Sequence, residues 1–412
     1  MTTVSRVFIP FALGYFMSYL FRVVNATIAS DLVADLGLDA ADLGLLTSTY
    51  FLTFAAFQLP LGMLLDRFGP RRTEAVLLLV AAAGAFLFAL APNVGTLIVG
   101  RGLIGLGVSA CLMAAFKAYF LWFPGGKLPL INGFQMAVGG LGAMAASVPV
   151  ESALAYTDWR GVFMVLGVMT VGVAVILFTV VPRREEPASP HGTFREQLGG
   201  VLEIMTSPVF WRIAPITCAS QASFLAVQGL WAGPWLRDVA GLDPEGVAHG
   251  LLVLSMALTA GFILAGGLAE RLGRFGIAPA AVAMVTMTVS MLAQLLLILQ
   301  LPIPPLFAWS LYALFGTSGI LIYPALAQTF PRHLAGRVNT GLNLPVFLAT
   351  FVFQWGIGGI IDLWPQTAAG GYDPQAYQAG FGIVLATQVL AMLWLIVFRR
   401  GRLPLRLDPA AA

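Results

Sequence analysis

The stretch Gly62-Met-Leu-Leu-Asp66-Arg67-Phe-Gly69 returns 204 residues later as Gly266-Gly-Leu-Ala-Glu270-Arg271-Leu-Gly273. In both copies a glycine, an acid, an arginine and a second glycine stand at the same spacing, directly after an apolar run. A chain that repeats itself at about half its length, in apolar segments, is typical of duplicated membrane proteins. The repeat therefore predicts two similar halves in a lipid bilayer.

Composition supports a membrane as the solvent of this chain. Hydrophobic residues make up 59% of it and charged residues only 10%, whereas a soluble domain carries about 25% charged residues. The two cysteines, Cys111 and Cys218, lie in apolar runs and suggest neither a disulfide framework nor a metal site. We expect no metal and no cofactor.

Twelve apolar runs have the length of about 20 residues that a membrane-spanning helix needs. They cover 7–29, 42–65, 74–92, 95–122, 129–153, 160–182, 209–236, 247–269, 276–300, 304–330, 338–362 and 378–399. The longest polar stretch separates the sixth run from the seventh. We therefore expect an all-α protein with an N-terminal six-helix bundle (1–182), a cytoplasmic linker (183–208) and a C-terminal six-helix bundle with a short cytoplasmic tail (209–412).

Basic residues give this arrangement a direction across the membrane. Sixteen fall on the side of the N-terminus, and only Arg160 and Arg237 fall in the opposite loops. The sixteen are Arg6, Arg67, Arg71, Arg72, Lys127, Arg183, Arg184, Arg195, Arg271, Arg274, Arg332, Arg337, Arg399, Arg400, Arg402 and Arg406. Because cytoplasmic loops are enriched in Lys and Arg, we expect a multi-pass protein of the inner or plasma membrane with both termini in the cytoplasm.

Two motifs resemble those of the major facilitator superfamily. The loop 62–72 is similar to the signature G-x-x-x-D-R-x-G-R-R between its second and third helices, with Pro70 where the first of the final arginines usually stands. Arg101-Gly-Leu-Ile-Gly105-Leu-Gly107 is similar to the fourth-helix motif R-x-x-x-G-x-G. The resemblance covers the whole chain and implies a secondary transporter built from two pseudo-symmetric six-helix bundles.

The repeated loops are the candidate cytoplasmic gate. The resemblance implies that an acid and arginines at these helix ends latch the two halves together in the outward-facing state. The gate residues are Gly62, Asp66, Arg67, Gly69, Arg71, Arg72, Glu270 and Arg271. The alternative is a pair of solvated loops whose arginines only set the topology.

Three basic side chains, Arg22, Arg101 and Lys117, lie inside predicted spans. Each costs about 2.5–3.5 kcal/mol at the bilayer centre, so none is expected to face lipid. The one acid that we expect deep in a span is Glu151, close to the outer end of its helix. This excess of positive charge favours an anion in a central cavity. The alternative is structural, with Lys117 paired to Glu151 and Arg22 held by backbone carbonyls.

The tract Tyr19-Leu-Phe-Arg22-Val-Val-Asn25 resembles the first helix of the organic-anion and organophosphate branches of the superfamily. The resemblance implies that Arg22 binds the carboxylate or phosphate of the substrate. Phe21 stands where some organic-anion members carry an acid for proton coupling, and Gln228 is nearest to the internal equivalent of Arg22. We expect Lys117 to be a second basic group, and we take Glu151 and Arg101 as candidates for proton coupling.

The C-terminal half offers neutral polar and aromatic groups to the body of such a substrate. The expected substrate-binding residues are Arg22, Lys117, Tyr19, Asn25, Gln228, Trp231, Asn343 and Tyr323. The aromatic residues among them have an equally simple explanation in helix packing. We expect a moderate-sized organic anion and protons as partners, with no nucleic acid, and a monomer in the bilayer.

Other functions are less well supported by the sequence. Neither an acid–histidine–nucleophile set nor a phosphate-binding glycine loop is present, so we expect no enzyme. An exporter of amphipathic compounds, such as drugs or siderophores, is the main alternative. A receptor on a transporter scaffold is a further alternative, but it would need an added soluble domain or a long tail, and we expect neither.

Overall fold

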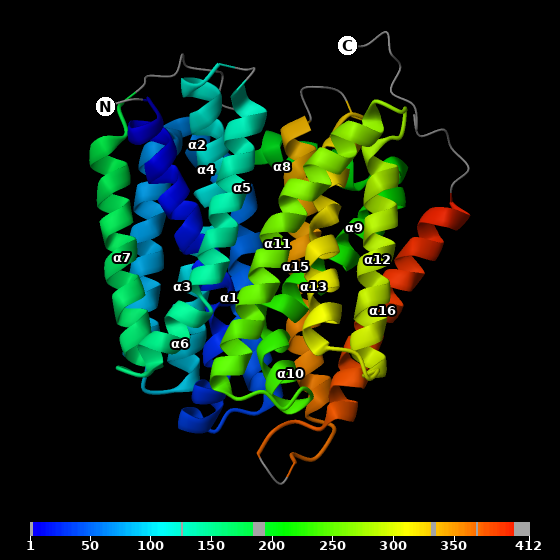
Figure 1. Ribbon diagram of the computed structural model, residues 1–412. Coiled ribbons are helices and arrows are strands. Elements are labelled where there is room, and N and C mark those ends of the chain that lie inside the picture. The colour runs from blue at the N-terminus through cyan, green and yellow to red at the C-terminus, as the bar shows by residue number, and fades with distance from the viewer. Residues whose placement is uncertain (1–2, 125–126, 184–193, 331–334, 368–369, 399–412) are drawn as a thin grey trace.

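The computed structural model describes residues 3–124, 127–183, 194–330, 335–367 and 370–398. Within these ranges all regular secondary structure is helical, and the long helices run side by side (Figure 1). Arg184, Arg332 and the predicted cytoplasmic tail from Arg399 lie outside the described residues, as do the side chains of Arg195 and Glu270.

Eleven helices of the described part are long and apolar enough to cross a membrane. One of them, α2 (Ala40–Ala89), has 50 residues. At 1.5 Å per residue it is more than twice as long as a bilayer core of about 30 Å is thick. It changes direction at Gly69, whose φ of 73° and ψ of 165° are not helical. The helix thus contains two spans, which confirms the predicted total of twelve.

The first six spans come from residues before the linker. They are α1 (Ile9–Leu36) with the π-helical turn Val4–Phe8 before it, the two arms of α2, α3 (Val94–Val108) with α4 (Cys111–Trp122), α5 (Leu128–Ala145) with α6 (Val148–Leu154), and α7 (Trp159–Val180). The predicted linker contains a short helix of its own, α8 (Phe194–Met205).

The other six spans follow the linker. They are α9 (Pro208–Ala226), which continues through the π-helical turn Val227–Trp231 into α10 (Ala232–Asp238), α11 (Pro244–Gly273), α12 (Pro279–Leu299), α13 (Pro305–Gly316) with the 3₁₀ turn Thr317–Leu321 and α14 (Ile322–Ala327), α15 (Ala335–Ile361), and α16 (Pro374–Val397).

Local chemistry explains where several spans begin and end. Asp39, Asn93 and Asp158 are extended residues whose side chains accept a hydrogen bond from the first turn of the helix that follows, as N-caps do. We predicted that the first span ends at residue 29, but α1 continues to Leu36. It ends at Gly37, whose φ of 62° is the left-handed conformation typical of a glycine after a helix.

The glycines of the fourth-helix motif bring α3 against α2. A Cβ added at Gly105 would lie 2.2 Å from the carbonyl oxygen of Tyr50, and one at Gly107 would lie 2.3 Å from the backbone nitrogen of Ala81. Tyr50 and Ala81 belong to the two different arms of α2. Small residues that let helix backbones approach closely are a common packing device in membranes, so this motif holds three spans together.

The two halves meet where the start of α2 packs against the end of α15. A Cβ at Gly358 would lie 2.2 Å from the carbonyl oxygen of Ala40, so the two backbones almost touch. The Asp362 carboxylate accepts hydrogen bonds from the backbone nitrogens of Ala40 at 2.9 Å and Ala41 at 2.7 Å. Negative charge is favourable at a helix N-terminus. We call this contact, between residues 40–54 and 347–362, the seal.

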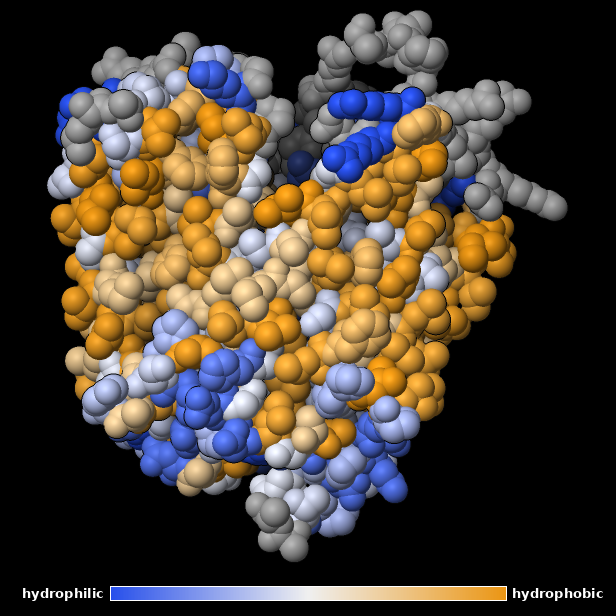
Figure 2. All heavy atoms as spheres, viewed as in Figure 1, coloured by the Kyte–Doolittle hydropathy of each residue, from blue (hydrophilic) through white to orange (hydrophobic). Residues whose placement is uncertain are grey.

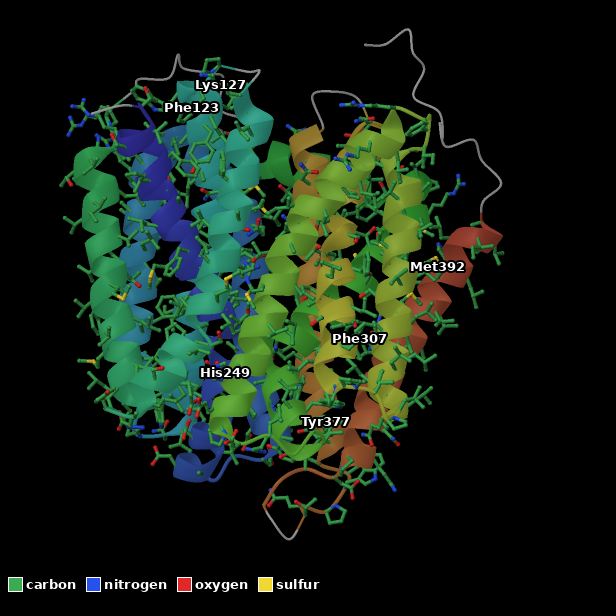
Figure 3. All side chains as sticks on the ribbon, viewed as in Figure 1. Phe123, Lys127, His249, Phe307, Tyr377 and Met392 are labelled. Atoms are coloured by element: carbon green, nitrogen blue, oxygen red, sulfur yellow. The ribbon has the colours of Figure 1, made fainter. Side chains whose placement is uncertain are left out.

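The surface shows which end of the molecule the seal closes. A broad hydrophobic band lies between more hydrophilic ends, as expected for a protein in a bilayer (Figure 2). At the upper end the surface dips between the two halves, whereas below it is continuous (Figure 2). Lys127, one of the basic residues predicted to be cytoplasmic, lies at this upper end, and His249 and Tyr377 lie towards the opposite end (Figure 3).

We expect replacement of Asp362 by alanine to weaken the seal. A hydrogen bond to a charged group is worth about 1.5–3 kcal/mol, and loss of about 1.4 kcal/mol changes an equilibrium tenfold. Ser48, which is fully buried, lies between Gly44 and Phe51 on the face of α2 towards α15. A membrane-impermeant maleimide should therefore label Ser48→Cys about tenfold faster in the Asp362→Ala background.

Asp373→Ala is the matched control, because this aspartate caps only its own helix, α16. Equal labelling rates in the Asp362→Ala and Asp373→Ala backgrounds would show that Asp362 does not hold the seal.

Candidate functional site

Arg22 is buried in the middle of α1 and has no carboxylate partner among the described residues. Only 7% of the residue is exposed. Its Cζ lies 4.4 Å from the ring centroid of Tyr19 and 5.6 Å from that of Phe54, and its Nε has no hydrogen-bond partner. Aromatic faces stabilise a cation but do not neutralise it. The guanidinium therefore keeps a positive charge available for an anion.

Tyrosine hydroxyls complete the surroundings of Arg22. Tyr15, Tyr19 and Tyr50 all lie within electrostatic reach of the guanidinium. The rings of Tyr15 and Tyr19 meet edge to face, with centroids 5.1 Å apart, and the Tyr50 hydroxyl donates to the carbonyl of Ser18 at 3.2 Å. Phenol hydroxyls donate and accept hydrogen bonds, so they can bind a polar substrate beside the charge.

Arg101 lies behind this site and holds the backbone of α1. It is fully buried. It donates from Nη1 to the carbonyl of Phe21 at 2.7 Å and from Nη2 to that of Arg22 at 3.4 Å. Its Cζ lies 5.0 Å from the centroid of the Tyr50 ring. Backbone carbonyls, the alternative predicted for Arg22, thus hold Arg101. Within the described residues the structure shows no such bond from the Arg22 side chain.

The second half contributes the π-helical turn next to α1. A Cβ added at Gly229 would lie 4.0 Å from the carbonyl oxygen of Arg22, so this turn, which also contains Gln228, packs against the backbone of α1 at Arg22. Trp231 donates from Nε1 to the carbonyl of Gln354 at 2.9 Å, and Gln354 donates back to the carbonyl of Ala226 at 3.2 Å. These bonds join the turn to α15.

Aromatic rings from both halves form a wall beside Arg22. The Phe54 ring lies 4.5 Å from that of Phe347, and the Phe51 ring stacks on Phe347 at 6.2 Å, with 13° between the planes. Tyr50 and Phe54 were not among the substrate-binding residues predicted from the sequence. Their spacing of four residues, which places them on one helix face, is the signal that could have found them.

Three other predicted binding residues make contacts elsewhere. Asn25 donates to the hydroxyl of Thr47 at 3.0 Å, within the first half. Tyr323 donates to Asn343 at 2.8 Å. Tyr323 packs against a hydrophobic cluster that includes Ile204 of the linker helix α8, whereas the rings around Arg22 belong to the main core. The structure thus joins Tyr323 to Asn343.

Lys117 binds the gate rather than the surroundings of Arg22. Its Nζ lies 2.9 Å from Asp66 Oδ1 and 2.9 Å from the carbonyl oxygen of Leu65. The predicted alternative, an ion pair between Lys117 and Glu151, is therefore wrong. Glu151 lies in α6, within electrostatic reach of Asp31 and Glu245, two acids near helix ends at the seal side.

The other gate residues in the first half also make contacts within that half. Arg71 donates from Nε to the carbonyl of Phe178 at 3.0 Å and lies over the ring of that residue. Arg67 lies over the ring of its neighbour Phe68. Arg72 and, in the second half, Arg271 are exposed. The contacts of Arg67 and Arg71 therefore lie within the first half. This agrees with the dip between the two halves at the upper end of Figure 2.

A buried acid was missed by the sequence analysis. Glu74, in the second arm of α2, is fully buried, so the expectation that Glu151 is the one acid deep in a span is wrong. The predicted third span began at residue 74, which placed this acid at a helix end. In the structure the second arm of α2 already begins at Pro70. Glu74 therefore lies within the helix, and its side chain is buried inside the first half.

Comparisons with known proteins agree with this architecture. The Major Facilitator Superfamily profile matches residues 11–361. The probable sulfoacetate transporter SauU of Cupriavidus necator is 31% identical over 161 residues, which are 39% of this chain and 37% of that protein. The gentisate transporter of Corynebacterium glutamicum is 25% identical over 355 residues, 82% of this chain and 78% of that one.

A solved structure shares the whole fold. A bacterial homologue of the human lysosomal transporter Spinster, in an inward-facing and unoccupied conformation, superposes with a TM-score of 0.78 at 17% identity, and the match covers 99% of both chains. The names of these relatives describe transporters. Because the profile match spans most of the chain, the chain belongs to the Major Facilitator Superfamily and is a multi-pass membrane protein.

Proposed function

We propose that this protein carries a small organic anion across the inner membrane by alternating access, with residues 1–182 moving against 209–412. The observation that carries the proposal is the buried Arg22 guanidinium, which lies at the contact of the two halves without a carboxylate partner among the described residues. Burying a charge without a partner is costly. A substrate anion would supply the missing charge and so be held at the point about which the halves move.

A carboxylate is the form of the anion that we favour. Sulfoacetate and gentisate, the compounds named for two relatives, both carry one. A planar carboxylate matches the fork of a guanidinium, which binds it through two parallel hydrogen bonds. The wall of Phe54 and Phe347 beside Arg22 suits an apolar or aromatic body on the same molecule. Gln228 and Trp231 would bind that body from the second half.

We assign the conformation as inward-facing. The seal closes the end opposite Lys127 (Figure 3), and the basic residues that predict the cytoplasmic side gather at the open end. Asp66, Arg67, Gly62, Gly69, Arg71 and Arg72, with Glu270 and Arg271 of the second half, would then form the closed gate in the outward-facing state. Lys117 belongs to this gate, because it pairs with Asp66 here.

Replacement of Arg22 should abolish uptake. Truncation of one member of a buried charge pair costs about 2–5 kcal/mol, so Arg22→Ala should lower affinity by at least about 30-fold. Arg22→Lys should recover little, since an ammonium cannot make the bidentate contact. Uptake of radiolabelled carboxylates into proteoliposomes measures both effects.

Arg160→Ala is the control, because Arg160 pairs with Asp35 at a partly exposed position and should leave uptake unchanged. Normal transport by Arg22→Ala, or preference of the wild type for cations, would contradict the proposal and favour the exporter of amphipathic compounds.

The aromatic wall should set preference for the body of the anion. An aromatic pair is worth about 0.5–1.5 kcal/mol beyond its buried area, so Phe347→Ala should raise KM for an aromatic carboxylate several-fold and change KM for acetate little. Phe351→Ala is the matched control, since Phe351 packs on Trp355, which is partly exposed on the same helix. If both variants change KM equally, Phe347 does not contact substrate.

The pair Lys117–Asp66 should affect turnover and not binding. The Asp66 side chain is 55% exposed, and such pairs contribute about 0–1 kcal/mol to stability. We expect Lys117→Met and Asp66→Asn to slow turnover with an unchanged KM, and the double variant to be no slower than either single one. A raised KM for anions in Lys117→Met alone would return Lys117 to the substrate site.

A further inference from the structure

Glu74 is a buried carboxyl group that the anion site does not use. It is fully buried, and neither of its oxygens has a hydrogen-bond partner. It lies against the bare backbone of α1, where a Cβ added at Gly14 would be 2.1 Å from its Oε1 and 3.7 Å from Leu78 of its own helix. The absence of a side chain at Gly14 therefore creates the space that the carboxyl group fills.

The surroundings of Glu74 contain no positive charge within the part of the chain that the structure describes. The titratable groups within electrostatic reach are Cys111 and Tyr119, both on α4. The Cys111 thiol, a weak donor, lies beside the carboxyl group, and Tyr119 donates to Gln135 of α5 at 2.7 Å. Lys117, on the same helix α4, binds Asp66.

An ionised carboxylate in this place would be unstable. Burial of an isolated charge is so costly that the group takes up a proton instead, and ionisable residues inside membrane proteins commonly mark proton and ion pathways. With Gly14 and Leu78 on two sides and only a thiol and a phenol near it, the neutral acid is the form that this conformation accommodates.

Glu74 is also connected to the anion site. Cys111 lies within electrostatic reach of both Glu74 and Arg22. Gly14 and Arg22 are eight residues apart on α1, or about 12 Å along the helix axis. A change in the contact between Glu74 and Gly14 would therefore act on the same helix that positions Arg22.

We propose that Glu74 binds the proton that is transported with the anion. This inference rests on the proposed function and names its coupling ion. In the inward-facing conformation Glu74 is protonated and packed on Gly14. A local movement of α1 against the second arm of α2, within the first half, then admits water to the carboxyl group, and the proton leaves to the open, cytoplasmic side. One proton moving with one monoanion makes the step electrically neutral.

Glu74→Gln tests the proposal, because the amide copies the protonated acid in size and cannot release a proton. In proteoliposomes, an inward proton gradient should drive accumulation of the anion by the wild type, and the accumulation ratio should fall to one in the variant. Exchange of labelled for unlabelled anion should remain in the variant, because exchange needs no net proton movement. Glu245→Gln, which changes an exposed carboxyl group in the first turn of α11, is the matched control and should accumulate the anion like the wild type.

Infrared difference spectroscopy tests the protonated state without any substrate. The carbonyl stretch of a protonated carboxylic acid should be present in the wild type at neutral pH and lost in Glu74→Gln, or in Glu74→Met if the amide disturbs folding. An unchanged band would overturn the proposal even if no anion is transported. Gradient-driven accumulation in Glu74→Gln would also overturn it, whereas lack of anion exchange by the wild type would count against the proposed function alone.

Discussion

The cost of an unbalanced charge inside the bilayer governs the arrangement of this protein. Arg101 is accommodated because backbone carbonyls of α1 accept its hydrogen bonds. Arg22 is accommodated only in part, by aromatic rings and hydroxyls that leave its charge in place. The two arginines are adjacent, yet one fixes the helix and the other remains available. The hydrogen bonds of Arg101 thus explain a structural role, whereas the unbalanced charge of Arg22 points to a functional one.

Close backbone contacts give the charges their positions. Glycines allow α3 to pack on both arms of α2 and allow α15 to reach the start of α2. Since Phe347 lies in the seal segment of α15, the packing that forms the seal also brings its ring against Phe54, which lies beside Arg22. The proposed anion site and the closed end thus meet at one contact between the halves, and we expect separation of the halves to change both.

Opposite ends of the molecule use acids differently. At the seal, Asp362 accepts from backbone nitrogens across the two halves. At the open end, Asp66 pairs with a lysine of its own half. An aspartate therefore joins the two halves at the seal, whereas an aspartate at the open end does not. The difference is that Asp362 reaches the other half and Asp66 binds within its own half. Glu74, which has a thiol beside it and no cation within electrostatic reach among the described residues, is a third case.

The sequence by itself was sufficient for the fold class, because twelve apolar runs, the repeated loop and the basic asymmetry are properties of composition and spacing. It also placed Arg22 inside a membrane span, since a charge inside an apolar run is visible without coordinates. It could not pair Lys117 with Asp66, place Arg101 against α1, or find Tyr50, Phe54 and Glu74. These contacts depend on which helix faces pack together. That packing is decided by close approach between segments that are far apart in the chain. Glu74 shows the reason most simply: its burial depends on the missing side chain of Gly14, sixty residues earlier in the sequence.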